Sequence, residues 1–356
     1  MTGGVDPVLR SLLTTPGPSG HEAQVAAAFR EACAAVADVV EATTDHVGST
    51  VGRLPGTGDG LGTAIVGHID EIGIAVSHID DQGFLWFLGV GGWDPIILVG
   101  QRVELLTRNG PIPGLIGKKP IHLMQDEDRK RVPKLTDLHI DIGARDGDEA
   151  REMVRIGDVG VIAGEPVELP NGRLASRSMD NRLGCWVAYE AMRLVHEGGG
   201  AAGDTYACAV TQEEITFQGA ITTMFGLQPD VALAIDVTHA TDAPGIDEKD
   251  NGRHHFGSGP AIVRGASLSP VVFELLVEAA EAEGIPYTLE ATARSTGTDA
   301  DAIVSSRAGI PTGCIGIPLR YMHSPVELVE LDDLQNTARL CAAFVKRLGP
   351  QQSFLR

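Results

Sequence analysis

Four apolar runs of the sequence each lead into side chains that can bind a metal ion or transfer a proton. In chain order these are His68 and Asp70 after TAIVG, Glu213 and Glu214 after YACAVTQ, Asp236 after VALAI, and His323 after CIGIPLRYM. In open α/β sheets, ligands and catalytic groups gather at the carboxyl ends of the strands. We therefore expect these side chains to converge although they are far apart in the chain.

The residue types in this set favour a hydrolytic metal centre. Two histidines with carboxylates and no thiolate suit a pair of Zn²⁺, Co²⁺ or Mn²⁺ ions better than a structural zinc. Asp180, in the segment SRSMDNR, precedes a predicted helix and lies near its positive end.

Each of these residues also has an ordinary interpretation. A lone histidine after a strand is usually a surface or hydrogen-bonded residue, and Asp180 alone is typical of a helix N-cap. The adjacent Glu213 and Glu214 are typical of a solvated surface. The joint placement argues for a site, because clustered carboxylates repel one another unless a cation neutralises them.

The elements that would position these residues alternate between helices and strands. Helices are predicted over residues 19–40, where Ser19 and Glu22 form a capping-box pattern, over 182–197 before a glycine stop, and over 270–283 after the N-cap Ser269. Continuous apolar runs over 205–210, 231–237 and 312–320 are typical of strands covered on both faces.

The middle of the chain has a different pattern. Short β-branched runs from about residue 73 to 165 are broken by prolines and by Asn109-Gly110, which predicts a hairpin. We expect an α/β fold: a mixed-sheet domain with helices on both faces, interrupted by a smaller, mostly β inserted domain. The predicted domains are residues 1–72 with 167–356, and 73–166.

Composition excludes several classes of function. The chain has 28 Lys and Arg against 48 Asp and Glu, a formal net charge of −20. Such a charge disfavours binding to nucleic acid or anionic lipid, which is recognised through clustered basic residues. No apolar stretch approaches the length of a membrane span, and the five cysteines form no CxxC motif. A reduced, cytoplasmic location is expected.

Six segments occur in an order that resembles one enzyme family. They are GHIDEIG from Gly67, SMDNR from Ser178, QEE from Gln212, IDVTHATDAPG from Ile235, TGTDA from Thr296 and RYMHSPVE from Arg320. Together they resemble the M42 metallo-aminopeptidases, the tetrahedral or glutamyl aminopeptidases, some of which are labelled endoglucanases. GKKPIHL from Gly117 and LHIDIG from Leu138 extend the resemblance into the insert.

The resemblance implies a site with two divalent metal ions. His68, Asp180 and Asp236 would hold one ion, and Asp180, Glu214 and His323 the other, so that Asp180 bridges. Glu213 would be the general base and Asp70 would orient His68, an arrangement in which a carboxylate sets the imidazole. The Asp180–Asn181 peptide would be cis. Supporting positions implied near the site are Thr298, Asp299, Arg320 and Tyr321.

The resemblance further implies that the insert mediates self-assembly into a dimer-based dodecamer. The sequence departs from the family pattern at three positions, Thr216 in place of a glycine, Asn181 in place of an aspartate and Ser258 in place of a lysine. These departures leave the preferred N-terminal residue open.

Our main hypothesis is an aminopeptidase that releases N-terminal residues from short peptides by means of a metal-activated water. A related metal-dependent deacylase or carboxypeptidase is the alternative. An endoglucanase is disfavoured, because glycosidases generally use two carboxylates and no metal. A non-catalytic metal-binding scaffold is also disfavoured, because both the expected ligands and the expected base are present.

Overall fold

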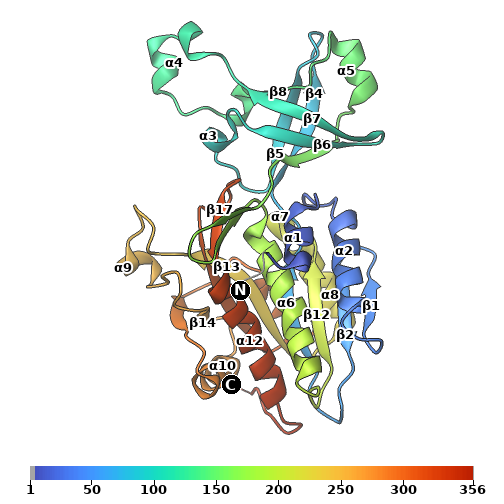
Figure 1. The fold of residues 1–356 in the computed structure, drawn as a ribbon, viewed down its shortest axis with the longest axis vertical. Helices are drawn as coiled ribbons and strands as arrows, with labels where there is room; N and C mark the ends of the chain where they lie inside the picture. Colours follow the sequence, from blue (N-terminus) through green and yellow to red (C-terminus); the bar gives the residue numbers. More distant parts are fainter. Residues whose placement is uncertain (1–4, 356) are drawn as a thin grey trace.

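The structure is a computed structural model that describes residues 5–355, apart from the side chain at position 128. Within this range one mixed sheet with helices on both faces lies below a small closed barrel (Figure 1). This confirms the expected fold class. The predicted domain boundaries stay predictions, and positions 1–4 and 356 lie outside the described residues.

The large sheet has the strand order β1-β2-β12-β3-β13-β16-β17-β11-β10, with β14 and β15 attached to β16. Its strands are β1 (Glu41–Thr44), β2 (Thr50–Leu54), β3 (Thr63–His68), β10 (Val167–Leu169), β11 (Arg173–Ser176), β12 (Thr205–Val210), β13 (Val231–His239), β14 (Ala261–Gly265), β15 (Thr288–Thr292), β16 (Thr312–Arg320) and β17 (Glu327–Glu330). The central strands β12, β3, β13 and β16 are parallel. Their carboxyl ends therefore share one edge, the edge that faces the barrel.

Helices cover both faces of this sheet. They are α1 (Pro7–Thr14), α2 (Ala23–Ala34), α6 (Met179–Glu197), α7 (Glu213–Thr216), α8 (Gln218–Leu227), α9 (Glu248–Asn251), α10 (Pro270–Glu283), α11 (Ala300–Ile303) and α12 (Leu331–Arg347). The predicted caps of α10 are confirmed, since the Ser269 side chain accepts from Val272 N and Gly284 ends the helix in the left-handed conformation. None of the helices in the described range is both long and apolar enough to cross a membrane.

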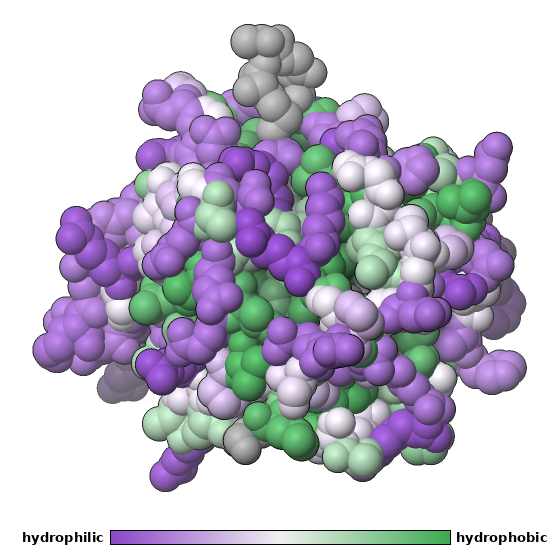
Figure 2. Space-filling model, turned by 90° about the horizontal axis from the view of Figure 1, so that it is seen from below, coloured by the Kyte–Doolittle hydropathy of each residue, from purple (hydrophilic) through white to green (hydrophobic). Residues whose placement is uncertain are grey.

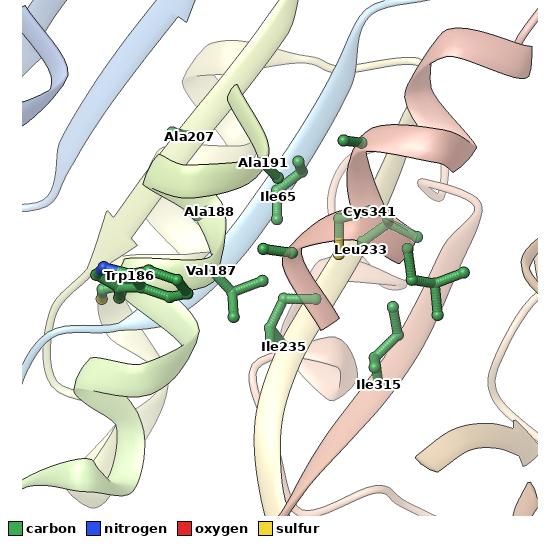
Figure 3. Close-up of a cluster of buried hydrophobic side chains, with 14 of the residues drawn as sticks. Ile65, Trp186, Val187, Ala188, Ala191, Ala207, Leu233, Ile235, Ile315 and Cys341 are labelled. Atoms are coloured by element: carbon green, nitrogen blue, oxygen red, sulfur yellow. The ribbon is translucent and has the colours of Figure 1, made fainter. Parts of the chain in front are cut away.

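Alternating side chains of the central strands pack into two separate apolar cores, one on each face of the sheet. Ile65, Leu233 and Ile315 pack with α6 and α12 on one face (Figure 3). Val66 and Cys314 pack with α8 and α11 on the other face. The two-residue period of a strand produces this division, and it explains why these strands are apolar at nearly every position. All five cysteines are buried and free.

The barrel is closed by the strands β4-β5-β8-β7-β6-β9. Their bounds are β4 (Gly73–Ile79), β5 (Leu85–Val90), β6 (Arg102–Thr107), β7 (Gly110–Gly117), β8 (His139–Asp141) and β9 (Val159–Ile162), with the short helices α3 (Pro95–Leu98), α4 (Asp126–Lys130) and α5 (Gly147–Met153) between them. The predicted hairpin at Asn109-Gly110 is confirmed by the antiparallel pairing of β6 with β7. The barrel has its own apolar core.

The end of the molecule away from the barrel has a mixed surface. In Figure 2 hydrophilic residues surround a recessed central area in which hydrophobic residues gather. Much of the exposed surface of any folded protein is apolar, so this mosaic is ordinary.

Two sequence expectations are wrong in detail. The helix expected over residues 19–40 is the shorter α2, which runs from Ala23 to Ala34. It starts late because Ser19 hydrogen-bonds Asp70, and Glu22 accepts from Gly20 N and Gln212 N instead of forming a capping box. Asp236 lies inside a strand rather than after it. Strand β13 continues to His239 because its pairing with β16 extends that far.

The close contact between β3 and α6 generates a stability prediction. A Cβ added at Gly67 would lie 2.4 Å from the carbonyl carbon of Gly184, so Gly67→Ala must push α6 away from the sheet. We expect a loss of about 1–3 kcal/mol in the free energy of unfolding, measured by urea denaturation. Gly164→Ala, where a Cβ meets nothing within 4 Å, is the matched control. Equal stability of the two variants would contradict this packing.

Candidate active site

A cavity of about 490 Å³ opens at the carboxyl edge of the central strands. Every predicted metal ligand and the predicted base line it, namely His68, Asp180, Glu213, Glu214, Asp236 and His323. They come from the end of β3, from within β13, from the segment after β16 and from the starts of α6 and α7. The convergence expected from the sequence is therefore present in the fold.

Asp180 lies between the two histidines of the cavity. Its Oδ1 is 3.1 Å from Nε2 of His68, and its Oδ2 is 3.3 Å from Nε2 of His323. One carboxylate thus presents a different oxygen to each imidazole, which is the placement that a bridging ligand requires. The peptide bond between Asp180 and Asn181 is cis, as the resemblance implied.

The remaining carboxylates are divided between the same two imidazoles. Glu214 Oε1 is 3.5 Å from His323 Nε2. Asp236 Oδ1 and Glu213 Oε2 lie 4.0 and 3.7 Å from His68 Nε2. Potential ligand atoms form two compact groups, His68 with Asp180 and Glu214, and His68 with Glu213 and Asp236.

Both histidines use the ring nitrogen that faces away from the cavity to contact a backbone carbonyl. Nδ1 of His68 is 3.3 Å from the carbonyl oxygen of Asp70, and Nδ1 of His323 is 2.9 Å from that of Gly92. A carbonyl oxygen can only accept, so Nδ1 carries the proton in both rings. Each Nε2 therefore faces the carboxylates, as metal-binding imidazoles do when the other nitrogen is held by a hydrogen bond.

Asp70 connects β3 to the start of α7. Its carboxylate is 3.4 Å from Nδ1 of His68 and accepts hydrogen bonds from Ser19 Oγ, Glu213 N and Glu214 N. Burial raises the pKa of Asp70, but the hydrogen bonds from His68 and Ser19 outweigh burial and lower it. An ionised Asp70 thus fixes both the imidazole and the backbone that carries the two glutamates.

Glu327 is a supporting residue that the sequence analysis did not single out. Its buried carboxylate accepts from Met179 N, Asp180 N and His323 N at 2.7, 3.2 and 2.9 Å. It therefore holds the two segments that carry Asp180 and His323. The only sequence signal was its position in RYMHSPVE, because a single glutamate in an apolar strand does not reveal which backbone groups it contacts.

Glu71 ties the same region to the N-terminal helix. Its carboxylate accepts from Gly17 N and pairs with Arg177 and the fully buried Arg182. Arg182 also donates to the carbonyl oxygens of Leu12 and Thr15. These contacts fix the backbone on both sides of Asp180.

The crowding of carboxylates changes their acidity. Burial first, then neighbouring negative charges, raise the pKa of Glu213 and Glu214 to about 8, and burial raises that of Asp236 well above its ordinary value. The hydrogen bond with Asp180 raises the pKa of His323 to about 9. Burial lowers the pKa of His68, but Glu213 and Asp180 more than offset this and raise it.

The repulsion between these buried carboxylates, together with their donor types, shows whether the residues suit a metal ion. Carboxylates that repel one another in a buried crevice are stabilised by a cation, and the donors are imidazole nitrogens and carboxylate oxygens without a thiolate. The set therefore fits one or more divalent ions of the Zn²⁺, Co²⁺ and Mn²⁺ type.

The four supporting positions are placed differently. Thr298 lines the cavity. Arg320 forms a two-armed pair with Asp242, and Tyr321 is about half exposed. Asp299 is buried, and its Oδ1 has no hydrogen-bond partner. Of the departures from the family pattern, Thr216 lines the cavity, whereas Asn181 links Ile235 O to Gly184 N beneath it.

Asp299 generates a prediction about pH. Burial raises its pKa from 3.8 to about 8. A carboxyl group with a raised folded pKa stabilises the fold at low pH, and this contribution is lost as the pH rises through the folded value. In metal-free protein, Asp299→Asn should therefore gain stability relative to wild type from pH 5 to pH 8, by at most about 1.4 kcal/mol per pH unit. Urea denaturation at each pH measures this.

The control for this prediction is Asp59→Asn, at an exposed position outside the cavity. Its stability relative to wild type should not change with pH. A stability difference between Asp299→Asn and wild type that stays flat over the same range would contradict a raised pKa at Asp299.

The chain is similar to known aminopeptidases over nearly its whole length. The family model described as M42 glutamyl aminopeptidase matches residues 48–340. A lysyl aminopeptidase of Pyrococcus furiosus is 32% identical, covering 96% of this chain and 97% of its own. The structure of an aminopeptidase from Desulfurococcus kamchatkensis is 37% identical with a TM-score of 0.89, covering 97% of this chain and 95% of its own.

A third similar protein is the TET1 peptidase of Pyrococcus horikoshii, described as assembling into a tetrahedron or a large octahedral shell. It is 30% identical with a TM-score of 0.83, covering 96% of this chain and 99% of its own. The sequence resemblance is thus confirmed, and the chain belongs to the M42 glutamyl aminopeptidase family of peptide-bond hydrolases.

Proposed function

We propose that this protein is a dinuclear metal-dependent aminopeptidase acting on short peptides. The observation that carries the proposal is the position of Asp180, whose two carboxylate oxygens face the Nε2 atoms of two different histidines. A single metal ion would need only one of these two oxygens. The proposal assigns one ion to His68, Asp180 and Asp236, and the other to Asp180, Glu214 and His323.

Two divalent ions held there would lower the pKa of a water molecule and polarise the scissile carbonyl. The chain's own residues handle the proton. Glu213 lies 3.7 Å from His68 Nε2 and lines the cavity, and it takes the proton of the attacking water and passes it to the leaving amine. Asp70 holds the backbone of Glu213, so it positions the base as well as the imidazole.

A related deacylase or carboxypeptidase is the alternative within the same chemistry. The free amine of the substrate separates the two, because an aminopeptidase loses activity when the peptide is N-acetylated whereas a deacylase does not. An endoglucanase and a non-catalytic scaffold remain weaker alternatives. Zn²⁺ and Co²⁺ are the first ions to test, followed by Mn²⁺, and a cytoplasmic location stays a prediction.

Glu213→Gln tests the function and the base together. The variant keeps the size of the side chain but cannot accept the proton, so kcat on aminoacyl p-nitroanilides should fall by at least about a hundredfold. Wild type should lose activity on chelation and regain it with Zn²⁺ or Co²⁺. Metal content measured on the same samples is the control, since Glu213→Gln should still bind two ions per chain. Undiminished turnover by this variant would remove Glu213 as the base.

We expect the chain to assemble into a dodecamer, and the barrel would provide the contacts between subunits. It carries several large apolar side chains that are more than half exposed, among them Leu88, Leu115, Ile121, Leu123 and Val132. Exposed apolar residues gathered on one part of a protein mark an interaction surface. We assign this surface to contacts between copies of the chain, through dimers that build a closed shell.

Leu123→Asp tests the assembly. Leu123 is 65% exposed in the chain, so the variant should fold normally, whereas an aspartate buried between subunits would be strongly disfavoured. Light scattering coupled to size-exclusion chromatography should show a smaller species than the wild type. An equivalent change at Leu355, which is 88% exposed near the end of the chain, should leave the mass unchanged. An unaltered mass for Leu123→Asp would exclude this part of the barrel.

A further inference from the structure

One acidic side chain of the cavity has no part in the proposed metal site. The carboxylates lining the cavity are Asp180, Glu213, Glu214, Asp236 and Glu290, and no lysine or arginine lines it. The first four are accounted for as ligands or base. Glu290, on strand β15, is left as an additional negative charge in the wall.

The strand register places Glu290 beside the metal site. Glu290 pairs with Val263 of β14, which pairs with Cys314 of β16, so all three side chains share one face of the sheet. Its Oε2 lies 3.6 Å from where a Cβ on Gly316 would be. The carboxylate therefore reaches across β14 towards Gly316, where the side chain of Thr238, which also lines the cavity, lies closer still, with its Cβ 2.9 Å from the same point.

Gly316 is also the register partner of Asp236 on β13. Neighbouring strands lie about 4.8 Å apart, so the Glu290 carboxylate is about one strand spacing to the side of the Asp236 position, on the same face. This offset is within the reach of one long amino-acid side chain. A substrate whose N-terminal residue is held at Asp180 and Asp236 can therefore extend its side chain towards Glu290.

Nothing among the described residues neutralises Glu290. Its Oε2 is buried without a hydrogen-bond partner, while the side chain as a whole is 30% exposed. The nearest basic group is Nε2 of His254 at 3.9 Å, which also lacks a hydrogen-bond partner. Burial outweighs the neighbouring Glu290 and lowers the pKa of His254, which disfavours the charged form of this imidazole.

The cavity also offers apolar side chains that suit a long aliphatic stem. Ile215, Phe217, Val237 and Met322 line the same cavity. Lysine and arginine side chains bury their methylene stems against apolar groups while the charged end contacts an acidic partner. A glutamate side chain in the same place would bring two like charges together.

We propose that Glu290 selects substrates with an N-terminal lysine or arginine, by pairing with the charged end of that side chain. The inference rests on the proposed aminopeptidase function and adds its substrate class. It also distinguishes a basic from an acidic preference, since the family includes both glutamyl and lysyl aminopeptidases.

The test compares metal-loaded wild type with variants on Lys-, Arg-, Met- and Glu-aminomethylcoumarin, because methionine resembles the lysine stem without its charge. Wild type should show a kcat/KM for Lys and Arg at least about tenfold above that for Met, and Glu should be the poorest substrate. Glu290→Gln should reduce kcat/KM for Lys and Arg by about 10- to 100-fold, the range for a hydrogen bond to a charged group. Its kcat/KM for Met should stay within about twofold.

Two control variants separate charge from structure. Glu290→Asp keeps the charge and should retain part of the Lys preference. Glu274→Gln removes one negative charge at an exposed position of α10, outside the cavity, and should behave as wild type. An equal loss on all four substrates in Glu290→Gln, or an unchanged Lys preference, would overturn the proposal.

A second measurement does not depend on any variant folding. Lysinamide should inhibit wild-type cleavage of Met-aminomethylcoumarin with an inhibition constant at least about tenfold below that of norleucinamide, and equal constants would overturn the proposal. The two proposals fail differently. Wild type that cleaves Met but shows no preference for Lys contradicts only the role of Glu290, whereas metal-loaded wild type that cleaves none of the substrates contradicts the aminopeptidase function.

Discussion

The cost of removing several carboxylates from water in one crevice is the constraint on which this structure depends. Asp180, Glu213, Glu214 and Asp236 lie around two imidazoles at the carboxyl edge of the sheet, and burial raises the pKa of three of them. Asp180 is the exception, because hydrogen bonds from His323 and His68 outweigh burial and lower its pKa. A buried cluster of carboxylates destabilises the fold unless positive charge compensates it.

The backbone around the cluster is held by buried carboxyl groups that do not line the cavity. Glu327 gathers three N–H groups from the two segments that carry Asp180 and His323. Asp70 does the same for the start of α7. Carboxylates suit this task because each can accept several hydrogen bonds, and breaking a buried set of this kind typically costs several kcal/mol. The cavity residues are thus positioned by backbone hydrogen bonds to buried carboxyl groups.

The sequence indicated the architecture well because its strongest signals are periodic. The continuous apolar runs at 205–210, 231–237 and 312–320 are strands that bury both faces, and this burial makes them recognisable. The helix start at Ser19 was wrong because a tertiary hydrogen bond to Asp70 competes with the local cap. Local patterns contain no information about partners 50 residues away.

In the candidate site, too, local sequence signals were recognisable whereas tertiary contacts were not. His68, Asp236 and His323 could be singled out because each comes directly after or close to an apolar run, although Asp236 proved to lie inside its strand. The resemblance supplied the pairing through Asp180. Glu327 acts through backbone N–H groups of other segments, and Glu290 is placed by its nearness to Gly316 on another strand. No local sequence motif indicates either arrangement. Arg182 illustrates the limit further. A fully buried arginine cannot be distinguished from an exposed one by its position in SMDNR.

The barrel reaches the cluster as well as the surface, which links the two parts of the fold. The carbonyl of Gly92, just after β5, accepts from Nδ1 of His323 and so fixes the tautomer that presents Nε2 to Asp180. Gly91 has φ +75°, and a Cβ there would lie 2.5 Å from Ile72 and 3.3 Å from Oε2 of Glu214, so only glycine brings this loop so close. A shift of the barrel would therefore move the acceptor that orients His323. In an assembly held through the barrel, subunit contacts would then bear directly on the geometry of the site.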